Sequence, residues 1–103
     1  MKHLDENHLK ANRAGRGSLA EAFVAMQSAD ECRALLKDLT TPAELEALVD
    51  RWRVAQLLDA GLPYREIHDR TGVSVTTIGR VARFLEMGNG GYQLALKRLQ
   101  GEQ

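Results

Sequence analysis

The stretch LPYREIHDRTGVSVTTIGRVARFL, residues 62–85, predicts two short helices joined by a tight turn at Gly72. Pro63 suits the first turn of a helix, because the N–H that proline lacks would be unpaired there in any case. Gly72 can adopt the left-handed conformation that ends a helix. Ser74 is a candidate N-cap for the second helix, since its hydroxyl can accept a backbone N–H from two or three residues further on. Together these signals predict a helix-turn-helix.

Helical spacing divides the side chains of this stretch between two faces. Four apolar residues fall on the inner face, namely Ile67, Val73, Ile78 and Val81. The outer face of the second helix carries Val75, Thr76, Thr77, Gly79, Arg80 and Arg83. This outer face is uncharged at its N-terminal end and bears arginines further along, and the major groove of DNA accepts a helix face of this kind.

From about Asp38 to Leu99 the chain carries the motifs of a known family. They are a Leu-Thr-Thr-Pro entry to a long helix, Arg-x-Arg within that helix, and Arg-Glu-Ile, Gly and Thr-Ile-x-Arg in the helix-turn-helix. These motifs resemble the Trp repressor superfamily, and LxxGNGGYxLAL at residues 85–96 resembles the signature of its YerC/YecD-like branch. The resemblance implies an all-α, Trp repressor-like fold of about six short helices that forms an intertwined homodimer.

The expected function is sequence-specific DNA binding by a transcriptional regulator. A symmetric dimer would place two copies of Ser74–Leu85 in successive major grooves, about 34 to 36 Å apart. The resemblance adds Arg65, whose counterpart in the tryptophan repressor reaches DNA from the first helix of the motif, and Tyr64 lies beside it. The residues expected to contact double-stranded DNA are Tyr64, Arg65, Ser74, Val75, Thr76, Thr77, Arg80 and Arg83.

The resemblance also predicts a vestigial pocket, which matches the ligand site of the tryptophan repressor in position but is not expected to bind a ligand. In the tryptophan repressor the indole lies between two arginines, and both positions match here, as Arg51 and Arg80. A glycine and a serine that follow in the repressor are replaced here by Val81 and Phe84. Each of these side chains would bury apolar area of its own. We therefore expect a vestigial pocket filled from within, no cofactor and no tryptophan corepressor.

Composition narrows the choice of protein class. The chain has 103 residues and no net charge, with 14 basic and 14 acidic side chains. The positive charge is local: residues 61–85 hold four arginines against two acidic residues, whereas residues 18–60 hold four basic against eight acidic residues. The zero total leaves open the alternative of a helical dimeric protein–protein interaction module that does not bind DNA. Without a catalytic pair or nucleotide loop, we expect no enzyme.

Cys32 is the only cysteine, so the chain cannot form an intrachain disulfide or a zinc site of the Cys-x-x-Cys kind. No metal site is expected. A chain with one cysteine and no possible intrachain disulfide is expected in a reducing cytoplasm. The sequence shows neither a signal peptide nor an apolar run of about eighteen residues, so no membrane association is expected.

The remaining segments predict a flexible arm and further helices within one domain. Residues 1–17 are polar and carry two glycines at their end, which predicts the arm, followed by one helical domain over residues 18–103. Ser18 and Ser28 are candidate N-caps for two amphipathic helices, and Thr41-Pro42 begins a long helix containing Trp52. The apolar faces exceed what a small protomer can cover, which favours a dimer.

Overall fold

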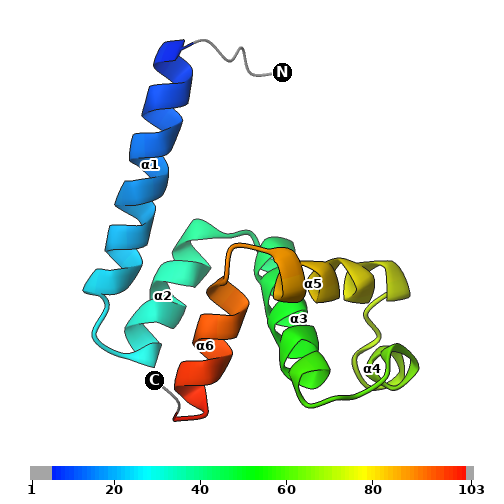
Figure 1. Cartoon of the computed structure of the whole chain (residues 1–103). Coiled ribbons are helices and arrows are strands. Elements are labelled where there is room, and N and C mark those ends of the chain that lie inside the picture. Colours follow the sequence, from blue (N-terminus) through cyan, green and yellow to red (C-terminus); the bar gives the residue numbers. More distant parts are fainter. Residues whose placement is uncertain (1–5, 102–103) are drawn as a thin grey trace. The chain divides into compact units, whose positions relative to one another are not determined.

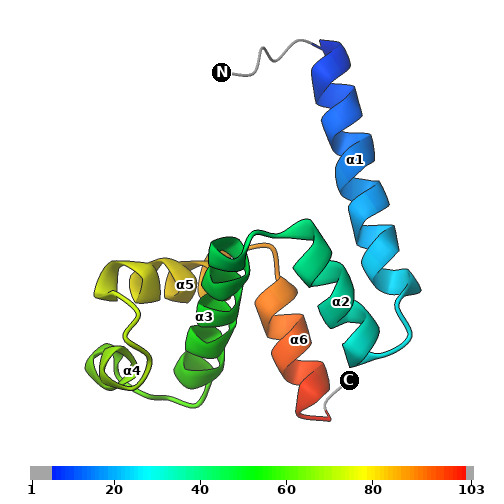
Figure 2. The same cartoon turned by 180° about the vertical axis from the view of Figure 1, so that it is seen from behind.

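The computed structural model describes residues 6–101, and this part of the chain consists of six α-helices without a strand. Contacts divide the chain into two compact units, one ending at Thr41 and one beginning at Pro42. The first unit holds α1 (Glu6–Ala25) and α2 (Ala29–Leu39). The second holds α3 (Pro42–Asp59), α4 (Tyr64–Thr71), α5 (Val75–Met87) and α6 (Gly91–Leu99). Figures 1 and 2 show these helices from opposite sides, and the all-α prediction is confirmed.

The core of the second unit is built around α3. This helix packs against α4, α5 and α6, while α5 also contacts α4 and α6. The buried cluster is aliphatic and consists of Val54, Ala55, Ile67, Val73, Ile78 and Val81. Trp52, Leu57, Leu58, Leu62 and Tyr92 are partly buried around it. The four residues that the sequence placed on the inner face of the helix-turn-helix therefore all lie in the core, as predicted.

The predicted helix-turn-helix is present as α4, a short turn and α5. Gly72 has a φ of +72°, and its N–H donates to the His68 carbonyl at 2.8 Å, which ends α4. The Ser74 hydroxyl accepts the Thr77 N–H at 3.2 Å and caps α5. His68 Nδ1 lies 2.7 Å from the Val73 carbonyl, to which it donates across the turn. Pro63 precedes α4 as its extended N-cap, one position earlier than predicted.

The glycine-rich segment after α5 forms a turn, and two of its glycines are needed for different reasons. A Cβ on Gly88 would overlap the Phe84 carbonyl oxygen, to which the Gly88 N–H donates at 2.9 Å. Gly90 has a φ of +86°, in the region that disfavours other residues. The Gln93 side chain then donates to the Leu85 carbonyl, which satisfies an acceptor at the end of α5.

The first unit differs from the sequence prediction at its start. Helix α1 already begins at Glu6, so the prediction of a flexible arm is wrong for residues 6–17, and Ser18 lies inside the helix instead of capping it. The physical reason is that the segment contains several good helix formers, which offset the two glycines at about 1 kcal/mol each. Residues 1–5 of the predicted arm lie outside the described residues. The predicted Ser28 cap of α2 is confirmed, since its side chain accepts the Glu31 N–H at 3.1 Å.

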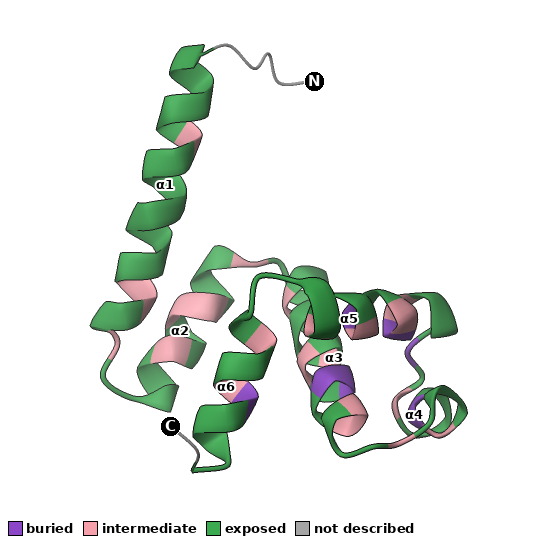
Figure 3. Cartoon of the chain, viewed as in Figure 1, coloured by how far each residue is buried: buried purple, intermediate pink, exposed green. Residues whose placement is uncertain are grey.

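Neither α1 nor α2 contains a buried residue. Figure 3 shows the same contrast, with the buried class confined to the second unit. Large apolar side chains of the first unit remain open to solvent: Leu19 is 45% exposed, Val24 84% and Leu39 52%. A single chain therefore leaves apolar surface on these helices uncovered.

Two glycine substitutions test this description of the helix-turn-helix. Gly72→Ala should lower the free energy of unfolding by about 1–2 kcal/mol, because alanine is strained in the left-handed region. Gly79→Ala, inside α5, should raise the same quantity by about 0.5–1 kcal/mol. Its added Cβ would lie 4.0 Å from the Tyr64 ring, an ordinary van der Waals distance. Urea denaturation at one fixed protein concentration measures both, and equal shifts in the same direction would contradict the turn geometry.

Candidate nucleic-acid interface

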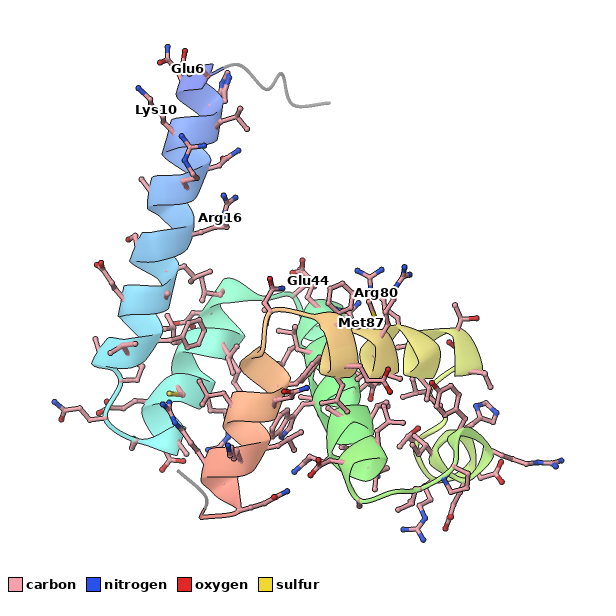
Figure 4. All side chains as sticks on the ribbon, in the orientation of Figure 1. Glu6, Lys10, Arg16, Glu44, Arg80 and Met87 are labelled. Carbon is pink, nitrogen blue, oxygen red and sulfur yellow. The ribbon has the colours of Figure 1, made fainter. Side chains whose placement is uncertain are left out.

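One face of α5 is buried and the opposite face is open. Ile78 is 0% exposed and Val81 2%, so these two side chains hold the helix on the core. On the open face Val75 is 55% exposed, and Arg80 and Arg83 are also exposed. Figure 4 shows Arg80 projecting from α5 on the side away from α4. The helix thus presents the face that the sequence analysis assigned to the major groove.

A hollow of about 460 Å³ lies along this open face. Its lining combines hydroxyl and guanidinium groups with one glycine and one ring, and consists of Thr76, Thr77, Gly79, Arg80, Arg83 and Phe84. Hydroxyl and guanidinium groups are the side chains that donate to phosphate oxygens and to base edges. Five of these six residues were predicted for the outer face, and the structure brings them together.

The Ser74 hydroxyl is occupied within the protein. It accepts the Thr77 N–H and also donates to Thr77 Oγ1 at 3.1 Å. Thr77 Oγ1 accepts that bond, so its own hydrogen remains to be donated outward. Among the predicted DNA-binding residues, Ser74 therefore has a capping role in the structure, whereas Thr77 retains a donor.

Helix α4 contributes two predicted residues next to this face. Tyr64 is 42% exposed, and its ring passes beside Gly79 of α5. Arg65 is exposed but does not line the hollow. Arg70, further along α4, forms an exposed ion pair with Glu66 at 2.7 Å. Of the four arginines of the helix-turn-helix, Arg70 is paired on α4, Arg65 is exposed on α4 outside the hollow, and the other two line the hollow of α5.

A second hollow, of about 450 Å³, lies on the other side of Arg80 and Phe84. It is lined by Arg51, Trp52, Arg80, Phe84, Asn89, Gly91 and Tyr92. The rings of Trp52 and Tyr92 are stacked, with centroids 6.5 Å apart and planes 14° from parallel. Two cationic side chains and an aromatic pair therefore border one open space.

This second hollow corrects the predicted vestigial pocket. Arg51, Arg80 and Phe84 meet there as predicted, but Val81 does not, because it points into the core. The expectation that Val81 would fill the space is therefore wrong: a β-branched residue on the inner face of α5 packs against α3 instead. Trp52 and Asn89 were not among the residues predicted for this pocket. Their position next to the matched arginines becomes visible only in three dimensions.

The guanidinium of Arg80 lies over the ring of Phe84, with Cζ 5.4 Å from the ring centroid. This distance is within the range of a cation–π interaction. The two residues stand four positions apart on one helix, a spacing at which side chains meet. Arg80 and Phe84 line both hollows, so the two hollows adjoin at this pair.

The helix-turn-helix and the two hollows lie within the part of the chain that a known protein family matches. The model of the Trp repressor protein family matches residues 16–100. The chain belongs to the Trp repressor family. The match includes the helix-turn-helix and both hollows, and this family consists of DNA-binding regulators.

Individual relatives support the same assignment. YerC, an uncharacterized protein of Bacillus subtilis strain 168, is 37% identical over 82 residues, which cover 80% of this chain and 79% of YerC. A Trp operon repressor homolog of Xylella fastidiosa strain M23 is 36% identical over 72 residues, covering 69% of this chain and 78% of the homolog. The crystal structure of a TrpR-like protein from Eubacterium eligens has a TM-score of 0.77 at 33% identity, covering 84% of this chain and 90% of that one. The Trp repressor-like fold is thus confirmed.

Over residues 6–101, no three His, Cys, Asp or Glu side chains gather in a way that could hold a metal ion. None of the helices in that range combines the length and the apolar character needed to cross a bilayer.

Proposed function

We propose that this Trp repressor family member is a cytoplasmic, sequence-specific transcriptional regulator that binds double-stranded DNA as a homodimer without a tryptophan corepressor. The observation that carries the proposal is the open face of α5. A capped helix is held on the core by Ile78 and Val81, and it leaves hydroxyl and guanidinium groups facing outward. This is the arrangement of a recognition helix, whose N-terminal residues contact base edges.

The chemistry of the open face divides into base and phosphate contacts. Val75 and Thr76 stand in the first turn, where an apolar group can meet a thymine methyl and a hydroxyl can bond a base edge. Arg80 and Arg83 lie further along α5 and suit phosphate oxygens, or guanine where the helix end tips into the groove. Arg65 and Tyr64 on α4 would reach the neighbouring backbone. The zero net charge of the chain does not oppose this reading, since binding depends on the local charge that faces the phosphates.

The homodimer is supported by the apolar surface of the first unit. Leu19, Val24 and Leu39 are each about half exposed or more, and neither α1 nor α2 buries a residue within one chain. Covering such helices with a second copy would remove apolar area from water at about 25 cal/mol per Å². A two-fold dimer would also present two α5 helices, as a near-palindromic DNA site requires.

Independence from tryptophan rests on Phe84. The hollow beside Arg51 and Arg80 is large enough for a small molecule, whose sites usually measure about 300–1,000 Å³. However, the Phe84 ring lies against the Arg80 guanidinium, with Cζ 5.4 Å from the ring centroid, so one face of that guanidinium is already covered. A ligand that stacks on this face of Arg80 would have to displace the ring. We therefore propose that DNA binding requires no tryptophan.

The dimer is tested by its mass. Light scattering at micromolar concentration should give twice the mass of the 11.4 kDa chain. Leu39→Lys, which puts a charge on the exposed apolar surface of α2, should shift the mass toward that of one chain. A monomeric parent protein would contradict the dimer and, with it, the use of two half-sites.

The DNA-binding face is tested by removing one arginine. Arg80→Ala should weaken binding to a duplex selected by the parent protein from random DNA by about 1–3 kcal/mol, because a contact to base or phosphate is lost. The free energy of unfolding should change by no more than about 1 kcal/mol, since the exposed residue loses only its contact with the Phe84 ring. Arg98→Ala is the matched control: it removes the same charge from the exposed surface of α6.

The same experiment separates the proposal from its alternative. Parent-like binding by Arg80→Ala, measured by fluorescence anisotropy, would show that the wrong face was chosen. Failure of the parent protein to enrich any duplex at low salt would favour the protein–protein interaction module.

Tryptophan independence is tested calorimetrically. Titration of the protein with millimolar L-tryptophan should give no heat of binding, and the affinity for the selected duplex should be the same with and without the amino acid. The reason is the covered face of Arg80. Saturable binding, or a DNA affinity that rises with tryptophan, would overturn this part of the proposal.

A further inference from the structure

Phe84 lies on the exposed side of α5. It is 41% exposed, and Val75 and Met87 of the same helix are also exposed, whereas Ile78 and Val81 are buried. It is not part of the buried cluster of the second unit. Burying the ring in the core therefore does not explain its presence, and its contacts on the surface must be considered.

The Phe84 ring contacts the Arg80 guanidinium, whose Cζ lies 5.4 Å from the ring centroid. An arginine side chain on a helix surface otherwise rotates freely, and binding DNA would cost the entropy of fixing it. A ring four residues along restricts the guanidinium to one side of the helix before DNA arrives. In addition, the planar guanidinium stacks well on an aromatic face without giving up its in-plane N–H donors.

The two hollows define the positions between which the Arg80 guanidinium could move without the ring. Arg80 and Phe84 border both, so the guanidinium could lie toward Arg51 in one hollow or toward Thr77 and Arg83 in the other. Two guanidinium groups in one hollow repel each other, whereas the ring attracts Arg80 along its own helix. The ring thus holds the Arg80 guanidinium along its own helix, at the border between the two hollows.

We infer that Phe84 is a positioning residue that preorganises Arg80 for DNA, as a built-in aromatic platform in place of a bound effector. The inference rests on the proposed function, because it assigns Phe84 a role in the DNA contact made by Arg80. The ring itself need not touch DNA. Its contribution is to lower the cost of ordering the guanidinium.

The first test uses the free protein and requires no DNA. In the parent, NMR signals of the Arg80 side chain should be shifted upfield by the ring current of Phe84. Phe84→Leu keeps an apolar side chain but removes the ring, and should abolish the shift. Phe84→Tyr keeps the aromatic face and should retain it. Identical Arg80 signals in the parent and in Phe84→Leu would overturn the platform whatever the protein binds.

The second test is a double-mutant cycle on the selected duplex. Phe84→Leu should weaken binding about 2- to 5-fold for each protomer, the range expected of an exposed cation–π contact, and Phe84→Tyr should bind like the parent. In the Arg80→Ala background, Phe84→Leu should have no further effect, because the residue it positions is absent. A merely structural role would weaken binding equally in both backgrounds and would lower thermal stability.

The outcomes distinguish this inference from the function on which it rests. Parent-like DNA binding by Phe84→Leu would overturn the positioning role and leave the proposed function intact. An additive cycle would do the same. Absence of DNA binding by the parent protein itself would overturn both.

Discussion

The structure depends on the requirement that α5 bury one face and keep the other free. Ile78 and Val81 stand three residues apart and are both almost completely buried against α3 and α4. Each fully buried aliphatic side chain contributes about 1.5–3 kcal/mol, so these two account for much of the anchoring of the helix. Because the anchor occupies one face, Val75, Thr76 and Arg80 are directed outward. The same two residues thus determine both the packing of the second unit and the open face that we propose contacts DNA.

Local signals explain why so much of the helix-turn-helix could be predicted from the sequence. The left-handed Gly72, the Ser74 cap and the inward positions each depend on residues within a few places of one another, and all were correct. The start of α1 could not be predicted in this way. Polar composition and two glycines predicted a flexible arm, but composition does not distinguish a solvated helix from an irregular segment when charged helix formers and alanines are interspersed.

In the candidate site, too, the part that depends on local contacts could be predicted, whereas the part that depends on distant contacts could not. The outer face of α5 follows from helical periodicity and was predicted, whereas the second hollow brings together residues of α3, α5 and the segment before α6. The resemblance located Arg51 and Arg80 there, yet it also placed Val81 in the space that the indole would occupy. A position on a helix is assigned to one face by its rotation about the axis, and for Val81 that rotation leads to the core. The contribution of Tyr92 requires the chain to turn back, which no local pattern specifies.

The glycine-rich segment that resembles the YerC/YecD signature has a geometric role in this site. Gly88 approaches the Phe84 carbonyl so closely that no side chain could be added there, and the chain then reverses through the left-handed Gly90. This reversal brings Tyr92 to the ring of Trp52 and completes the hollow next to Phe84. The backbone of Phe84 is therefore tied to the turn, while its ring is tied to Arg80. If the Phe84 ring positions Arg80, then the geometry of the glycine-rich turn also affects where that ring lies. A side chain at Gly88 would displace the carbonyl of the residue that holds the arginine, so it should affect DNA binding as well as folding.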